Sequence, residues 1–313
     1  MKRAPLMSNA SANQLPSHVR IVEVGARDGL QNESAVSTQS KIALINALAA
    51  AGIKDIEAGA FVSPKWVPQM ADSNEVISAL ELPDCNLTAL TPNLKGAEAA
   101  HAVGIKEFAI FTAASESFCQ KNINCSIDES IARFKDVMAF AKAHNIRVRG
   151  YVSCVLGCPY EGDIDPQAVL TVTEKLLALG CYEISLGDTI GVGTAKKVDQ
   201  LLDLLLSKID KSVLAVHFHD TYGQALTNIY TALKRGIATV DSAVAGLGGC
   251  PYAKGASGNV ATEDVVYLLQ GLGIEHGIDL ERLAEAGWAI CSALNKQPVS
   301  KVSLALKNQA AEQ

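Results

Sequence analysis

The sequence predicts an α/β fold of the (β/α)₈ TIM-barrel type, followed by an additional C-terminal helical segment. Short apolar runs rich in β-branched residues alternate with amphipathic helical patterns from residue 19 to about residue 273. Eight such units of roughly 30 residues each are typical of a closed parallel barrel. The first run leads into Gly25-Ala-Arg-Asp-Gly29, which is not the Gly-x-Gly-x-x-Gly sequence found after the first strand of many open, doubly wound sheets. The doubly wound sheet is therefore the less favoured alternative.

The individual elements follow from the spacing of apolar residues, which is two in strands and close to 3.6 in helices. The predicted strands are 19–24, 55–58, 87–90, 108–111, 147–153, 182–186, 214–219 and 239–244. The predicted helices are 41–51, 94–103, 131–144, 167–179, 194–206, 225–234 and 262–272, and a further helix, 280–294, is expected to pack across part of the barrel. No linker rich in Pro, Gly or Ser interrupts this pattern. We therefore expect one catalytic domain over residues 19–313 and an N-terminal extension over residues 1–18.

The composition limits the possible partners and compartments. Hydrophobic residues make up 49% of the 313 residues and charged residues 19%, which is enough apolar material for a large core. The net charge of −6 argues against nucleic acid or an anionic membrane as a partner. The chain has no apolar run long enough to span a bilayer, and its first 18 residues lack the apolar region of a secretory signal. We expect a cytoplasmic enzyme, or one of the mitochondrial matrix in a eukaryote, although the transit signal is weak. The eight cysteines show no regular disulfide framework.

Side chains near the C-terminal ends of the predicted strands form a candidate metal site. His217 and His219 lie two residues apart on one strand, so both imidazoles face the barrel mouth. In a closed barrel the eighth strand lies between the seventh and the first, which places Asp28 and Asn259 on the same arc. Two imidazoles, a carboxylate and an amide oxygen suit Mg²⁺, Mn²⁺ or another first-row divalent ion. The competing interpretation is a pair of hydrogen-bonded core histidines, but the position of Asp28 favours the metal site.

Polar residues beside this arc are expected to bind the substrate. Arg27 keeps its proton and suits an oxyanion that develops during reaction, the alternative being an ion pair at the surface or with Glu57. Glu57 is expected to hold Arg27 or a metal-binding histidine rather than to act as a ligand. Gln31 and Asp188, which follow the first and sixth predicted strands, complete the predicted substrate-binding set.

The loop from residue 246 to 259 contains five glycines and one cysteine, Cys250. Its order of residues does not fit the phosphate-binding Gly-x-x-x-x-Gly-Lys-[Ser/Thr] motif. Glycines at this density suit a lid that closes over a substrate and carries a reactive side chain to it. An unperturbed thiol titrates near pH 8.5, roughly, and can therefore donate and accept protons near neutrality. We expect Cys250 to be catalytic, and the alternative is a thiol that only packs.

Several of these segments together resemble the 3-hydroxy-3-methylglutaryl-CoA lyases. The most specific are VEVGARDGLQNE at 22–33 and VAGLGGCPYAKGASGN at 244–259, and the others are 61–69, 149–154, 183–191 and 216–224. The resemblance covers nearly all of residues 19–301. Ala26 and Ala243 depart from the residues common in that family, and neither is a candidate ligand.

The resemblance implies a metal-dependent carbon–carbon lyase that cleaves 3-hydroxy-3-methylglutaryl-CoA to acetyl-CoA and acetoacetate, as in leucine breakdown and ketone-body formation. It implies a metal site at Asp28, His217, His219 and Asn259, a substrate-binding Arg27, and a lid cysteine, Cys250, linked to acid–base chemistry. Cys250, His217 or Asp28 could each move a proton, and Cys250 is favoured because lid closure would deliver it. The resemblance also implies a small acyl-CoA partner and a homodimer.

Other functions remain open at the level of the sequence. The nearest is a related acyl-CoA lyase or a Claisen-type synthase of the same metal-dependent barrel group. A hydrolase barrel would require further histidines at other strand ends. A non-catalytic metal-binding barrel would not require Arg27 beside Asp28 or a cysteine-bearing loop.

Overall fold

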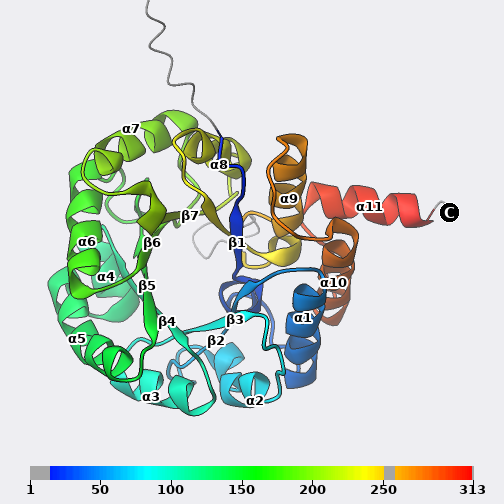
Figure 1. The fold of residues 1–313 in the computed structure, drawn as a ribbon, viewed down its shortest axis with the longest axis horizontal. Coiled ribbons are helices and arrows are strands. Elements are labelled where there is room, and N and C mark those ends of the chain that lie inside the picture. The colour runs from blue at the N-terminus through cyan, green and yellow to red at the C-terminus, as the bar shows by residue number, and fades with distance from the viewer. Residues whose placement is uncertain (1–14, 250–257, 312–313) are drawn as a thin grey trace, which may run out of the picture.

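Eight parallel strands close into a barrel in the computed structural model, which describes residues 15–249 and 258–311 (Figure 1). Each strand pairs with its neighbours in chain order, and the last returns to the first through the register pair Arg20↔Thr239. The strands are β1 (Arg20–Glu23), β2 (Asp55–Ala60), β3 (Asn86–Leu90), β4 (Glu107–Ala113), β5 (Arg147–Ser153), β6 (Glu183–Asp188), β7 (Leu214–Phe218) and β8 (Thr239–Ser242). The predicted fold class is confirmed.

Helices surround the barrel and cover its outer apolar surface (Figure 1). They are α1 (Thr38–Ala50), α2 (Ser73–Ser78), α3 (Leu94–Ala102), α4 (Glu116–Ile123), α5 (Ile127–Ala143), α6 (Pro166–Leu179), α7 (Ala195–Leu206), α8 (Ala225–Lys234), α9 (Thr262–Gly271), α10 (Leu280–Ala293) and α11 (Lys301–Ala311). Short helical turns are η1 (Gly25–Gly29), η2 (Pro68–Met70), η3 (Lys211–Val213) and η4 (Val244–Gly246).

Local sequence signals explain where several helices begin and end. Ser126 caps α5 by accepting the N–H of Glu129, and the Glu129 side chain accepts the N–H of Ser126 in return. Asp165 caps α6 and is followed by Pro166 at the first helical position. Gly180 ends α6 with φ of 112°, a left-handed conformation that glycine adopts without a steric penalty.

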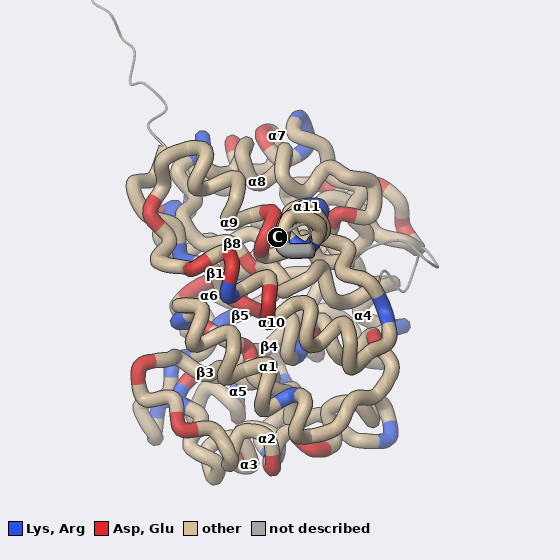
Figure 2. The backbone as a smooth tube through the Cα atoms, turned by 90° about the vertical axis from the view of Figure 1, so that its right-hand side faces the viewer, with Lys and Arg blue, Asp and Glu red and all other residues tan. Residues whose placement is uncertain are grey.

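The C-terminal segment contains two helices. The predicted helix 280–294 is α10, which contacts α1, and α11 packs against α9 and α10 and extends outward from the barrel (Figure 1). Acidic and basic residues are interspersed over the side of the molecule that bears α10 and α11 (Figure 2). Among the described residues, no helix has the length and apolar character needed to cross a membrane.

Three helices were not predicted from the sequence: α2, α4 and α11. The helix α4 is the most consequential, because its residues line the cavity at the barrel mouth. It has only eight residues, Glu116–Ile123, and a mixed polar sequence, so its apolar periodicity is too short to recognise. The predicted strand boundaries agree with the observed ones to within two residues, and the strand 147–153 matches β5 at both ends, whereas β8 ends at Ser242 rather than at residue 244.

Charged side chains occupy the barrel interior, where branched apolar residues usually dominate. Arg149 and Glu183, on β5 and β6, are 1% and 3% exposed, and Asp241 on β8 is 1% exposed. Arg149 donates to Glu183 at 2.7 Å and to Asp241 at 2.7 Å. Nearer the N-terminal ends of the strands, Arg20 pairs with Glu183 and with Asp55. Buried charges are tolerated when they are paired in this way.

Candidate active site

The first strand delivers Arg27 and Asp28 to the barrel mouth through the π-helical turn η1, Gly25–Gly29. The buried carboxylate of Glu23 accepts the N–H of Gly25 at 2.8 Å and that of Val244 at 2.9 Å. It therefore ties this turn to the segment that follows β8. Turns of this type are rare and often occur at functional sites, because they direct side chains to positions that a regular helix would not reach.

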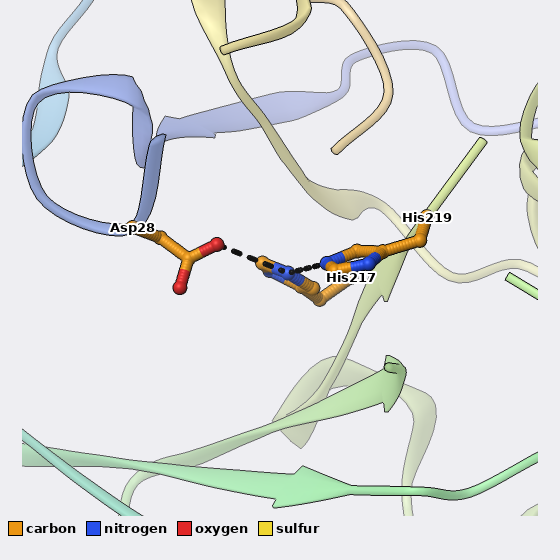
Figure 3. Close-up of side chains that lie close together, drawn as sticks. All are labelled: Asp28, His217 and His219. Carbon is orange, nitrogen blue, oxygen red and sulfur yellow. Dashed lines mark hydrogen bonds and ion pairs between the residues drawn. The ribbon is translucent and has the colours of Figure 1, made fainter. Parts of the chain in front are cut away.

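His217 at the end of β7 and His219 just beyond it face Asp28 across the mouth (Figure 3). The Nε2 atoms of the two histidines are 3.4 Å apart, and Nε2 of His217 is 3.9 Å from Oδ2 of Asp28. One potential ligand atom from each residue lies within 4.8 Å of the other two. A divalent ion coordinated at about 2.0–2.2 Å by each ligand requires ligand atoms at separations of this order. The geometry therefore supports a metal site.

The protonation states of two of these groups, Asp28 and His219, also suit a cation. Burial alone would raise the pKa of Asp28, but the charges of Arg27, His217 and His219 outweigh it and lower the pKa to about 2. Burial, assisted by the neighbouring His217, lowers the pKa of His219 to about 4, which leaves this imidazole neutral near pH 7. Burial also lowers the pKa of His217, but the neighbouring carboxylates of Asp241 and Asp28 raise it overall. The site thus combines a carboxylate and imidazole nitrogens, a mixed ligand set typical of first-row divalent ions and Mg²⁺.

Asn259 lies beside the same carboxylate. Its Nδ2 donates to Oδ2 of Asp28 at 2.8 Å and to the carbonyl of Leu247 at 3.1 Å, and its backbone forms a bridge with His219. The amide reaches the site, but in this orientation its nitrogen rather than its oxygen faces Asp28. Ligation of a metal by the Asn259 oxygen stays a prediction that requires the amide to turn.

Arg27 forms the ion pair that the sequence raised as an alternative, and it lines the cavity as well. Its guanidinium lies 2.6 Å from Glu57 and 2.8 Å from Asp28, while its Nε has no hydrogen-bond partner among the described residues. Glu57 is fully buried and does not line the cavity, so it holds Arg27 from behind. Burial raises the pKa of Glu57, and the charge of Arg27 opposes that rise.

The two remaining predicted substrate-binding residues differ in position. Gln31 lines the cavity and donates to Oδ1 of Asp28 at 2.9 Å. Asp188 does not line the cavity, and its buried carboxylate accepts the N–H of Gly193 at 2.8 Å in the turn after β6. Alternate residues of a strand face opposite sides, and here Gly187 and Thr189 face the cavity instead. The structure therefore gives Asp188 a part in shaping this turn, with a pKa that burial raises to about 6.

A cavity of about 760 Å³ opens at this end of the barrel, which is within the usual size of small-molecule sites. Arg27, Asp28, His217 and His219 are among its polar lining residues. Its apolar wall includes Val62, Leu90, Phe111, Phe118 and Phe134. Lys121 and Arg133, from α4 and α5, add positive charge to its lining.

Cys250, predicted to be catalytic, lies outside the described residues. The described ends of its loop approach one another, since a Cβ added to Gly258 would lie 2.1 Å from the carbonyl oxygen of Gly248. A Cβ added to Gly248, whose φ is +97°, would lie 2.9 Å from Nδ2 of Asn259. Both glycines are therefore required where the loop leaves the metal site and returns to it.

Comparison with known proteins places this geometry in a family. The HMGL-like family profile matches residues 18–290. The mitochondrial hydroxymethylglutaryl-CoA lyase of Bos taurus is 59% identical over 301 residues, which cover 96% of this chain and 93% of that protein. The chain belongs to the hydroxymethylglutaryl-CoA lyase family. A second member, from Pseudomonas aeruginosa, is named 3-hydroxy-3-isohexenylglutaryl-CoA/hydroxy-methylglutaryl-CoA lyase and is 57% identical over 95% of this chain and 99% of its own.

Solved lyase structures share the fold over nearly the whole chain. The crystal structure of the hydroxymethylglutaryl-CoA lyase from Pseudomonas aeruginosa matches with a TM-score of 0.93 and 57% identity, covering 94% of this chain and 99% of that one. A lyase from Acinetobacter baumannii, solved in complex with coenzyme A and 3-methylmalate, matches with a TM-score of 0.88 and 36% identity over 92% of this chain and 95% of its own. The resemblance inferred from the sequence motifs is confirmed.

The sequence analysis did not identify several buried or cavity-lining groups that adjoin this lyase site. It assigned no role to Asp241, to Arg149 or to Tyr151, although all three are buried. A buried charged residue in a short strand, such as Asp241 between Val240 and Ser242, is a usable signal, because such a side chain must find a partner inside the barrel. Lys121 could not have been assigned, because α4 was not predicted, and Arg133 was on a predicted helix but received no role.

Proposed function

We propose that the protein cleaves 3-hydroxy-3-methylglutaryl-CoA into acetyl-CoA and acetoacetate, and that Mg²⁺ or Mn²⁺ is the metal. The observation that carries the proposal is the convergence of Asp28, His217 and His219 within 4.8 Å in the lining of a large cavity, beside the buried Arg27. The names of the relatives support the same reaction. They favour it over the Claisen-type synthases of the same barrel group.

Asp28, His217 and His219 would hold the metal, with the amide oxygen of Asn259 as a fourth protein ligand. When bound, a divalent cation supplies Lewis acidity toward the 3-hydroxyl of the substrate. The neutral state of His219 and the ionised state of Asp28 near pH 7 leave both groups ready to bind a cation, whereas the raised pKa of His217 means that binding would have to displace a proton held there.

Residues of the chain supply the remaining chemistry. A base accepts the proton of the 3-hydroxyl, the C2–C3 bond breaks, C3 becomes the ketone of acetoacetate, and the electron pair passes to C2 as the enolate of the acetyl thioester. A proton added to C2 completes acetyl-CoA. Arg27 lines the cavity, keeps its charge and is fixed by Glu57 and Asp28, so it is suited to stabilise the enolate oxygen. Gln31 is placed to orient the substrate beside Asp28.

We propose Cys250 as the residue that moves the proton, with His217 and Asp28 as the alternatives. A Cys250→Ala variant that keeps near-full turnover, beside His217→Ala and Asp28→Ala variants that lose it, would rule out the cysteine. The measurement is the steady-state release of acetoacetate from each variant.

Lys121 and Arg133 are the proposed contacts for the anionic nucleotide of coenzyme A. Both line the cavity, and Lys121 lies 3.7 Å from the centre of the Tyr160 ring, which orients the cation. Arg133 donates to the carbonyls of Ile123 at 3.3 Å and Asn124 at 3.5 Å, so it also holds the end of α4 in place.

The deciding experiment measures acetoacetate released from 3-hydroxy-3-methylglutaryl-CoA by protein stripped with chelator and then given Mg²⁺ or Mn²⁺. We expect no turnover without metal, recovery with metal, and loss of turnover in His217→Ala. His144→Ala serves as the matched control, because His144 is an exposed histidine at the end of α5. Full turnover by metal-free protein, or condensation of acetyl-CoA with a 2-oxoacid instead of cleavage, would contradict the proposal.

Three further points are proposals that rest on the sequence and the family. They are a homodimer, a cytoplasmic location, and a single domain over residues 19–313. Sedimentation, cell fractionation and limited proteolysis test them in turn.

A further inference from the structure

Asp241 lies where it can orient the metal-binding imidazole of His217. The two residues are direct partners in the register of β7 and β8, and both are buried. Oδ2 of Asp241 is 3.4 Å from Nδ1 of His217, while Nε2 on the other side of the ring faces Asp28 and His219. A separation of 3.4 Å is longer than an ordinary hydrogen bond, and Nδ1 has no closer partner among the described residues. We propose that Asp241 is the positioning residue that holds the proton of His217 on Nδ1 and so leaves the lone pair of Nε2 for the metal.

The carboxylate of Asp241 is itself held rigidly. Arg149 donates to its Oδ1 at 2.7 Å and to its Oδ2 at 3.0 Å, and Ser185 donates to Oδ2 at 2.7 Å. Arg149 is in turn bound by Glu183 at 2.7 Å. A carboxylate with this many charged and polar donors cannot rotate away from His217. Such partners of metal-binding histidines fix both the ring orientation and the tautomer.

The same arginine also reaches the substrate side of the site. Arg149 donates to the hydroxyl of Tyr151 at 2.9 Å, and that hydroxyl lies 3.5 Å from Oε2 of Glu57, the partner of Arg27. The ring of Tyr151 meets that of His217 edge to face, with centroids 6.1 Å apart. A continuous chain of contacts therefore connects His217, through Asp241 and Arg149, to Arg27. These contacts therefore hold both the metal-binding His217 and the substrate-side Arg27 in position.

An Asp241→Asn variant tests whether Asp241 sets the tautomer of His217, because asparagine has nearly the same shape as aspartate but can donate a hydrogen bond. Arg149 donates to both oxygens of Asp241, so an amide nitrogen must oppose one of these contacts. Placing the nitrogen at Oδ2 opposes the longer Arg149 contact, at 3.0 Å, while the Ser185 hydroxyl at the same position can rotate to accept instead of donating. This orientation turns an N–H donor toward Nδ1 of His217. The imidazole would then carry its proton on Nε2, where the metal should bind.

The test is Mn²⁺ binding to the metal-stripped protein, measured by electron paramagnetic resonance. We expect Asp241→Asn to weaken binding by about 10- to 100-fold, as is typical when such a partner of a metal ligand is lost. Glu183→Gln is the matched control, because it neutralises the other carboxylate on Arg149 without touching His217, and it should bind Mn²⁺ within about threefold of the wild type. Equal weakening by both variants would mean that Asp241 only neutralises Arg149, and unchanged binding by Asp241→Asn would overturn the inference.

A measurement on the wild type keeps the inference testable if the variant does not fold. Nitrogen-15 NMR of the Mg²⁺-loaded, histidine-labelled protein should place the proton of His217 on Nδ1, and a proton on Nε2 would overturn the assignment. The inference rests on the proposed metal site, but the two fail differently. A wild type that binds no Mn²⁺ contradicts the proposed function, whereas normal binding by Asp241→Asn contradicts only the role of Asp241.

Discussion

Replacing Arg27 by methionine should separate its chemical role from its structural one. Arg27 lies 2.6 Å from the fully buried Glu57, and no other cation pairs with Glu57 among the described residues. Breaking a buried ion pair by removing one partner costs about 3–5 kcal/mol, because the other charge stays buried. Since burial already raises the pKa of Glu57, protonation limits the loss, and we expect a value near the lower end, about 3 kcal/mol. At about 2 °C per kcal/mol for a chain of this size, Tm should fall by about 6 °C.

The effect on turnover should be larger and should not follow stability. Loss of a fixed donor to a developing oxyanion typically lowers kcat by about 10²–10³-fold. The double variant Arg27→Met/Glu57→Gln removes the orphaned charge while nearly preserving shape. Its stability should return to within about 1–2 kcal/mol of the wild type, because both members of a buried pair are then neutral. Its kcat should stay as low as that of the single variant.

Acetoacetate release with saturating metal and substrate, together with thermal unfolding of both variants, measures the two effects. Recovery of turnover in the double variant along with its stability would refute the reasoning, because the arginine would then only neutralise Glu57. A single variant with normal kcat would refute it as well. Glu57→Gln alone is the third corner of the cycle, and it should retain the Arg27 charge and more activity than Arg27→Met.

Three further perturbations have expected outcomes. Mn²⁺ at 100 times its Kd should add about 2.7 kcal/mol to the free energy of unfolding of metal-stripped protein, and a His219→Ala variant that still shows this gain in thermal melts would contradict the metal site. Burial raises the pKa of Glu263 to about 8, so the folded state retains a proton that the unfolded chain loses. The free energy of unfolding should therefore fall as pH rises from about 4.5 to 8, by at most about 5 kcal/mol. Glu263→Gln, which keeps an acceptor for the N–H of Ala245, should flatten this part of the profile in denaturant titrations, and an unchanged slope would argue against the raised pKa. Lys121→Ala should raise KM for the acyl-CoA substrate by about 3- to 10-fold at low salt, with kcat unchanged. A substrate shortened to the pantetheine thioester lacks the anionic nucleotide, so its KM should depend neither on the substitution nor on the salt concentration.

The relation between Asp28, His217 and His219 was accessible from the sequence because it depends on rules that are local or topological. Residues two apart on a strand share a face, and in a closed barrel the first and last strands are neighbours. These two rules bring residues together that are 189 positions apart or more in the chain, as the structure confirms. The alternative for Arg27, an ion pair with Glu57, was also foreseen, and the structure contains it while leaving the arginine at the cavity wall.

The directions in which Asp188 and Asp241 face could not be predicted from the sequence, because they depend on contacts between strands. Both are buried acidic residues on strands, yet one faces the turn after β6 and the other faces the barrel interior beneath His217. Which side a strand-end residue faces depends on where the strand stops alternating, and that point is set by neighbouring strands and helices. The helix α4 was missed because eight residues of mixed polarity carry too little periodicity.

The sequence by itself determined the barrel, the order of its units, the family and the convergence of the three side chains of the candidate metal site, because apolar spacing and strand-end position can be read along the chain. Only the tertiary structure decided the cavity with its lining from α4, the contact of Asp188 with the turn after β6, and the position of Asp241 and Arg149 next to His217. The last of these features arises from side chains that are far apart in the chain, 92 positions in the case of Arg149 and Asp241, and that meet inside a closed barrel. Their orientations follow from packing and charge pairing in three dimensions, which no local pattern records.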